Sequence, residues 1–173
     1  MSSRLTEEQI DHILAAIVGK TNLRRLDVYL SDISRISPAL FAKAISNVQD
    51  VAVGPYLNEP NQSCGEIGEQ MLALFVAITE KERPMRTLDL YVQGAIENID
   101  ADVIGKAFNR LESIHIEDTK FRAEQLTSLA RNILKDESKL KNMMLFDLYF
   151  EEMGLDLEAD LVDKVRKKIG GFL

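Results

Sequence analysis

The sequence predicts a single α/β domain over residues 1–173, in which about five parallel strands alternate with helices. The first observation behind this prediction is a short apolar alternation at residues 85–91 that recurs along the chain. The second is that segments with apolar residues at helical spacing lie between the copies. The copies begin 25, 37, 26 and 29 residues apart, and the longest interval contains a loop insertion at about residues 54–65. Such self-similarity indicates a repeat architecture.

The repeated segments are the expected strands, and they occupy residues 23–29, 48–54, 85–91, 111–117 and 140–146. Parallel strands cannot be joined by tight turns, so each connection must cross over the sheet. Crossovers of one hand place the connecting helices on one side. We therefore expect a parallel sheet that has all its connecting helices on one face and leaves the other face open.

The first helix is predicted from Thr6, which stands three residues before Gln9 in the spacing of a capping box. Gly19 is expected to end this helix. Its apolar residues, all assigned to one buried stripe, are Ile10, Ile13, Leu14, Ile17 and Val18.

The later helices are expected to begin at Ser37-Pro38, near residue 66, after Asp100, near residue 123 and near residue 158. Pro84 should end the helix that precedes the central strand. The apolar positions of the second helix recur 63 residues later in the fourth, which indicates duplication: Leu40, Phe41, Ala44 and Ile45 are matched by Val103, Ile104, Ala107 and Phe108. Lys43, Lys106 and Lys164 share one register and are expected on the solvent side.

Composition limits the possible partners. Hydrophobic residues make up 46% and charged residues 28% of the chain, and the net charge is −7. An acidic surface does not favour nucleic acid or anionic lipid. No apolar run approaches the roughly 20 residues of a membrane span. The early acids and the one cysteine, Cys64, lead us to expect a reducing, cytoplasmic location.

The strand segments carry a Leu-x-x-Leu-x-Leu pattern, read as Leu23, Leu26, Val28; Val48, Val51, Val53; Met85, Leu88, Leu90; Leu111, Ile114, Ile116; and Leu140, Met143, Leu145. With this pattern the chain resembles ribonuclease-inhibitor-type leucine-rich repeat proteins and is similar to uncharacterised invertebrate leucine-rich repeat proteins. The resemblance implies a short horseshoe-shaped solenoid, with strands on the concave face and helices on the convex face. The family places Asn or Cys in a ladder after each strand, where this chain has Ser31, Tyr56, Gln93, Thr119 and Leu148.

The strand residues that alternate with the core positions are expected on the open face of the sheet. Aromatic side chains flanked by carboxylates are typical of a protein-binding face, and the acids favour a partner with a basic surface. The predicted partner-binding residues are Arg25, Asp27, Tyr29, Thr87, Asp89, Tyr91, His115, Glu117, Met144 and Phe146. The alternative is that these tyrosines only pack on the sheet and on one another.

Asp89 and His115 should lie on neighbouring strands, about one strand spacing of ~4.8 Å apart. We interpret them as a surface ion pair with a pH-dependent contact. Neither a metal site nor an acid–base pair fits, because Ala52 and Met144 flank them and no nucleophile is near. Glycine-rich phosphate loops, Cys-x-x-Cys and nucleophile elbows are absent from the sequence. The chain is therefore predicted to be no enzyme and to need no cofactor or metal.

The leading functional hypothesis is a non-catalytic adaptor or scaffold that binds another protein through the open face. One alternative is a regulator acting in trans on an enzyme such as a small GTPase, with the 54–65 loop as the contact. Another is a homodimer formed through the edge of the last strand, because an uncovered edge invites strand pairing.

Overall fold

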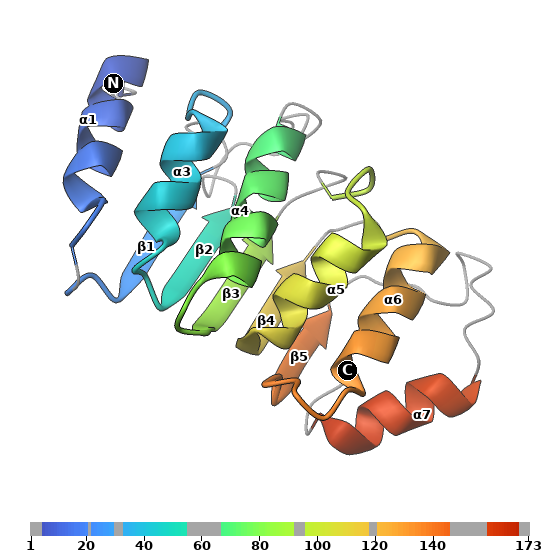
Figure 1. Ribbon diagram of the computed structural model, residues 1–173. Helices are drawn as coiled ribbons and strands as arrows, with labels where there is room; N and C mark the ends of the chain where they lie inside the picture. The colour runs from blue at the N-terminus through green and yellow to red at the C-terminus, as the bar shows by residue number, and fades with distance from the viewer. Residues whose placement is uncertain are drawn as a thin grey trace.

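The computed structural model describes residues 5–20, 22–29, 33–54, 67–91, 96–117, 121–145 and 159–169. Over these ranges the chain forms a five-stranded sheet with the strand order β1-β2-β3-β4-β5, in which every neighbouring pair is parallel. Helices lie between successive strands in the sequence, and α3, α4, α5 and α6 stand side by side over one face of the sheet (Figure 1). The expected α/β class and parallel sheet are confirmed.

The bounds of the elements follow the repeated pattern closely. The strands are β1 (Arg25–Tyr29), β2 (Asp50–Gly54), β3 (Met85–Tyr91), β4 (Leu111–Glu117) and β5 (Asn142–Leu145). The helices are α1 (Glu7–Ile17), α3 (Pro38–Ile45), α4 (Gly68–Glu80), α5 (Ala101–Asn109), α6 (Ala123–Ile133) and α7 (Ala159–Lys168). Helix α1 packs beside α3 at one end of the row, and α7 packs beside α6 at the other.

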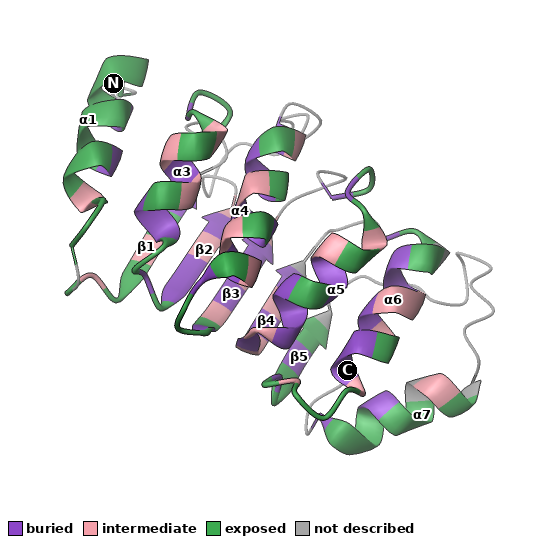
Figure 2. Ribbon diagram, viewed as in Figure 1, coloured by how far each residue is buried: buried purple, intermediate pink, exposed green. Residues whose placement is uncertain are grey.

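The core lies between the sheet and the helix layer. In β3, Met85, Leu88 and Leu90 are fully buried, while Thr87 and Asp89 between them are only partly buried (Figure 2). Strict alternation would not bury both Met85 and Leu88, which are three residues apart. The strand start accommodates them because two successive amides, of Arg86 and Thr87, donate to the same carbonyl of Gln49. The amides of Gln49 and Asp50 share the carbonyl of Arg24 in the same way.

Helix ends carry the signals read from the sequence. Thr6 and Gln9 form a reciprocal capping box, and the Asp100 carboxylate accepts from the amides of Asp102 and Val103. Gly19 follows α1 with φ +81°, a conformation that glycine adopts at no steric cost. Ser37 precedes the first-turn Pro38 as expected, but its side chain makes no capping hydrogen bond.

The predicted buried stripe of α1 is wrong in part. Ile10 and Leu14 are buried, whereas Ile13 is 48% exposed and Val18 is also exposed. The reason is position, because α1 stands at the end of the helix row and its described neighbour in that row is α3. The lysines of the three short helices, Lys43, Lys106 and Lys164, are exposed as predicted.

The turns before α3 and α5 are built alike. Ile33 and Ile36 before α3 correspond to Ile96 and Ile99 before α5, and all four are buried. Each turn is held by a buried glutamine from the following long helix. Gln70 of α4 donates to the Ile36 carbonyl over 3.0 Å, and Gln125 of α6 donates to the carbonyls of Ile96 and Ile99 over 2.8 and 2.7 Å.

Basic side chains bridge the C-terminal ends of neighbouring helices. Lys81, after α4, donates to the carbonyl of Ile45 at the end of α3 and to the carbonyl of Val48 beyond it. Arg110, after α5, donates to the Lys81 carbonyl, and Lys168 in α7 donates to the Lys135 carbonyl. Cations at these ends satisfy carbonyls that have no partner inside the helix and complement its dipole. Burial nevertheless lowers the pKa of the Lys81 amine from 10.5 to about 8.

Several predictions lie outside the described residues: the ladder positions Ser31, Tyr56, Gln93, Thr119 and Leu148, the loop beyond Gly54, Cys64 and Phe146. Within the described ranges, no helix has the length and apolar character needed to cross a membrane.

The buried Lys81 should make stability depend on pH in one direction. Between the folded pKa of about 8 and the unfolded value of 10.5, the unfolded chain binds more protons, so stability rises with pH. After it loses its proton, the Lys81 amine still has two N–H groups, one for each of the carbonyls of Ile45 and Val48. Between pH 7 and pH 10, we expect the free energy of unfolding of wild type to rise by about 1–3 kcal/mol relative to that of Lys81→Met. Urea unfolding measures this difference.

The exposed Lys43→Met controls for the loss of a lysine charge. A wild-type minus Lys81→Met difference that stays constant, or falls as pH rises, would contradict the assignment of a desolvated Lys81.

Candidate binding face of the sheet

The open face of the sheet is the side opposite α3–α6, and its side chains stand in columns set by the strand register. The first column contains Arg25, Asp50, Thr87, Ser113 and Asn142, the second Asp27, Ala52, Asp89, His115 and Met144, and the third Tyr29, Gly54, Tyr91 and Glu117. Of the residues predicted to bind a partner, the columns contain Arg25, Asp27, Thr87, Asp89, Tyr91, His115 and Met144 with described side chains. The side chains of Tyr29 and Glu117, and the whole of Phe146, lie outside what the structure describes.

Arg25 links two carboxylates on the open face. Its Nε lies 2.8 Å from Asp27 Oδ1 on the same strand, and its Nη2 lies 3.3 Å from Asp89 Oδ2 on β3. The guanidinium therefore reaches past β2, where the second column has only the methyl group of Ala52. One cation between two acids leaves this cluster with a net charge of about −1 at neutral pH.

A second ion pair fixes the start of β3. Arg86 donates from Nε to Asp50 Oδ1 over 2.9 Å and from Nη2 to Oδ2 over 2.7 Å, the two-point geometry that arginine makes with carboxylates. The Asp50 side chain is 8% exposed. The hydrogen bonds from Arg86 lower the pKa of Asp50 below 3.8, against the opposing effect of burial.

Tyr91 and His115 form an aromatic pair in the half-buried part of the face. The Tyr91 hydroxyl lies 3.3 Å from His115 Nδ1, and the rings meet edge to face with centroids 5.2 Å apart. Gly54 on β2 makes room for the tyrosine, since a Cβ there would stand 3.1 Å from its ring. Asp89 and His115 are neighbours in the register as predicted. Asp89 pairs with Arg25 and the His115 ring contacts Tyr91, where we expected Asp89 and His115 to pair with each other.

Met144 on β5 extends the face with an apolar side chain that is 46% exposed. In the first column, Thr87 and Ser113 are partly buried and Asn142 is exposed. The described face thus combines an aromatic pair, an exposed thioether, hydroxyls and a net acidic cluster. These groups suit non-covalent recognition of another molecule. No cluster of three His, Cys, Asp or Glu that would hold a metal ion occurs in the described ranges.

Comparison of the chain with protein-family models, with curated proteins and with solved structures found no match in any of the three. The assignment of a site therefore depends on this chain's own geometry.

Sequence reasoning missed polar side chains in the helix layer and apolar ones on its surface. Gln70, Gln125 and Lys81 are buried, and the match of Gln70 with Gln125 at 55 residues' separation is the signal that would have found two of them. Leu72 and Val76 of α4 are exposed although both are aliphatic. Their exposure could have been predicted, because both residues fall outside the helical stripe formed by Met71, Leu74, Phe75 and Ile78.

The Asp50–Arg86 pair should contribute measurable stability, because its carboxylate is buried and doubly bonded. We expect Asp50→Asn to lower the free energy of unfolding by about 1–2 kcal/mol at pH 7. The matched control is Asp27→Asn, at a carboxylate that is 52% exposed and also paired with arginine, which should change it by less than about 0.5 kcal/mol.

The folded pKa of Asp50 is depressed, so its contribution is present above pH 3.8 and is lost as pH falls through the folded value. The difference in the free energy of unfolding between wild type and Asp50→Asn should therefore be smaller in acid than at pH 7. Urea unfolding at pH 7 and near pH 3 measures it, and a gap that widens in acid would refute this account.

Proposed function

We propose that this chain is a leucine-rich-repeat protein of the horseshoe type that binds another protein through the open face of its sheet and has no catalytic role. The sequential parallel strands, the helices on one face and the inward packing of those Leu-x-x-Leu-x-Leu side chains that are described support the fold assignment. Alternating short and long helices, α3, α4, α5 and α6 with 8, 13, 9 and 11 residues, agree with it.

The observation that carries the binding proposal is an open sheet face on which Tyr91, His115 and Met144 stand beside the Arg25 cluster. Aromatic rings bury much area, tyrosine is among the residues that dominate binding energy, and methionine is enriched at protein interfaces. The net acidic cluster of Arg25, Asp27 and Asp89 selects a basic partner and steers its approach.

The face is also held in place before binding. Arg25 is bonded at both ends of its guanidinium, and Tyr91 contacts both Gly54 and His115. Side chains already ordered by such contacts lose less entropy on association. The strands beneath them keep their spacing through the parallel ladder. We also propose a reducing, cytoplasmic location, which the single cysteine supports.

Self-association is the second candidate, and its support is the position of β5. This strand, Asn142–Leu145, stands last in the sheet order, and it carries the exposed Met144. An unpaired strand edge offers amides and carbonyls to a second chain. Light scattering distinguishes this candidate, since a dimer at micromolar concentration supports it and a monomer at high concentration removes it.

The open face is tested by the double variant Tyr91→Ala/Met144→Glu. Protein domains selected from a displayed library by the wild-type chain should bind the variant at least tenfold more weakly, since the loss of two anchors costs about 2 kcal/mol or more. Biolayer interferometry measures the affinities.

The matched control is Thr127→Glu on the outer surface of α6, which leaves the open face intact and should bind normally. Circular dichroism and thermal melting establish that both variants fold. The proposal is refuted if none of the selected domains distinguishes wild type from the open-face variant.

A further inference from the structure

The charges in the columns of the open face are unequal in number, and the inference drawn from them rests on the binding function proposed above. Arg25 is the one cation that Asp27 and Asp89 share. The remaining charged side chain described in these columns is Asp50, which Arg86 already neutralises with two hydrogen bonds. One further cation would therefore give each carboxylate its own partner.

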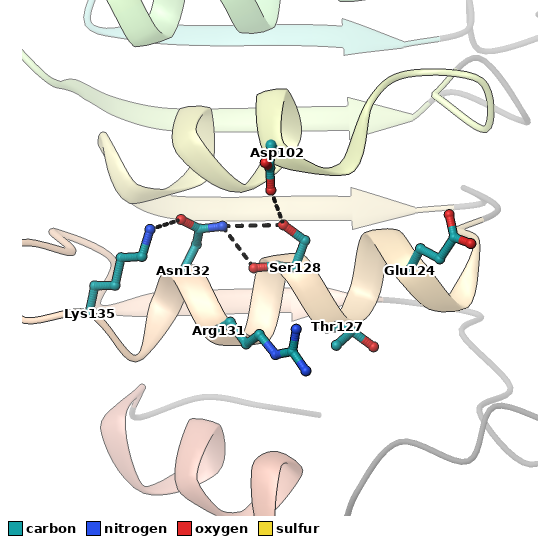
Figure 3. Close-up of a pocket in the computed structure, with 7 residues that line it drawn as sticks. All are labelled: Asp102, Glu124, Thr127, Ser128, Arg131, Asn132 and Lys135. Carbon is teal, nitrogen blue, oxygen red and sulfur yellow. Dashed lines mark hydrogen bonds between the residues drawn. The ribbon is translucent and has the colours of Figure 1, made fainter.

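Two other charged surfaces of the described chain are balanced. The pocket between α5 and α6 has two acids and two cations, which Figure 3 labels: Asp102, Glu124, Arg131 and Lys135. Its Asp102 already accepts a hydrogen bond from the Ser128 hydroxyl. The groove between α3 and α4 is lined by four acids and four cations. Charge therefore selects no partner at these two places, whereas the open face has an excess of one acid.

Arg25 holds its two acids unequally. Its Nε lies 2.8 Å from Asp27 Oδ1 on the same strand, whereas its Nη2 lies 3.3 Å from Asp89 Oδ2 on β3, beyond β2. The Arg25 side chain is 52% exposed, and ion pairs at such exposed positions contribute little to stability. The contact with Asp89 can thus be exchanged at small cost, while the bond to Asp27 keeps Arg25 in place.

The surroundings of Asp89 suit an incoming cation. Its side chain is 17% exposed, and among the described residues Arg25 is its one ion-pair partner. Ala52, next to Asp89 in the register, has only a methyl group. The Tyr91 ring leans toward β2, because a Cβ on Gly54 would lie 3.1 Å from it. A cation above Ala52 would meet the carboxylate and lie next to an aromatic ring, which also attracts cations.

An acidic partner suits this place less well. Its carboxylate would be a third acid around one guanidinium, and like charges across an interface disfavour binding. A basic side chain gains attraction as the partner docks, because the removal of water from Asp89 strengthens the interaction between opposite charges. The same removal of water makes a carboxylate without a cation of its own costly.

We propose that Arg25 pairs with Asp89 only in the free protein, and that a lysine or arginine side chain of the partner takes its place at Asp89 in the complex. Arg25 then pairs with Asp27 alone. Asp89 selects the basic partner, and Arg25 weakens the binding of that partner because the incoming cation must displace it.

The test uses the acetylated and amidated heptapeptide Thr-Val-Ser-Arg-Ser-Val-Thr, and a copy with Gln in place of Arg. NMR titration of isotope-labelled protein measures the affinities. Relative to wild type, Arg25→Gln should bind the arginine peptide at least about threefold more tightly, and Asp89→Asn at least about threefold more weakly. The glutamine peptide should show neither difference.

The matched control for net charge is Arg131→Gln on the exposed side of α6, which should bind the arginine peptide like wild type. A second readout needs no variant. In wild type, the Arg25 guanidinium should rotate faster when the arginine peptide is added, because Nη2 is released from Asp89. The guanidinium of Arg86, which is bonded twice to Asp50, should rotate at an unchanged rate. NMR exchange spectroscopy measures both rates.

The proposal is overturned if Arg25→Gln binds the arginine peptide no more tightly than Arg131→Gln does. It is also overturned if the Arg25 guanidinium rotates at the same rate with and without saturating peptide, or if the peptide does not bind saturably. Failure of the proposed binding function is recognised separately, because that test uses whole domains and the double variant Tyr91→Ala/Met144→Glu.

Discussion

The structure depends on one constraint, the burial of the repeated apolar strand residues under the helix layer. Leu88 and Leu90 at the centre of the sheet, and their counterparts on the neighbouring strands, are withdrawn from water only when the helices cover them. Their burial forces the residues between them to the other side. The alternation that builds the core therefore also sets the columns of the open face, and the parallel register aligns them across the strands.

Polar side chains link each helix to the turn or helix end that precedes it in the layer. Gln125 and Lys81 satisfy carbonyls in the turns of the preceding unit, where an unpaired carbonyl would be costly. The turns before α3 and α5 share such a contact, through Gln70 and Gln125, whereas α4 and α6 differ at positions outside the core, as Leu72 and Thr127 illustrate. Change at such positions leaves the core intact.

The fold and the columns were predictable from the sequence because both follow from the regular spacing of apolar residues. That spacing can be read within each short segment of the chain. Asp27 and Asp89 share a column for that reason. The bridge from Arg25 was not predictable, since it depends on a long side chain reaching over Ala52. The exposure of Ile13 depends on which helices exist beside α1, and the burial of Lys81 depends on a neighbouring helix end. The apolar stripe of a helix does not show which elements pack beside that helix in the folded chain.

The sequential order of the strands governs how the molecule comes apart. Each described strand pairs only with the strands next to it in sequence, so force applied to the termini passes through the units in series. Peeling one end breaks a single ladder and exposes the next, with little change in the far half. Mechanical unfolding should then proceed in steps from an end, in the manner of a zipper, rather than in one rupture of the whole sheet.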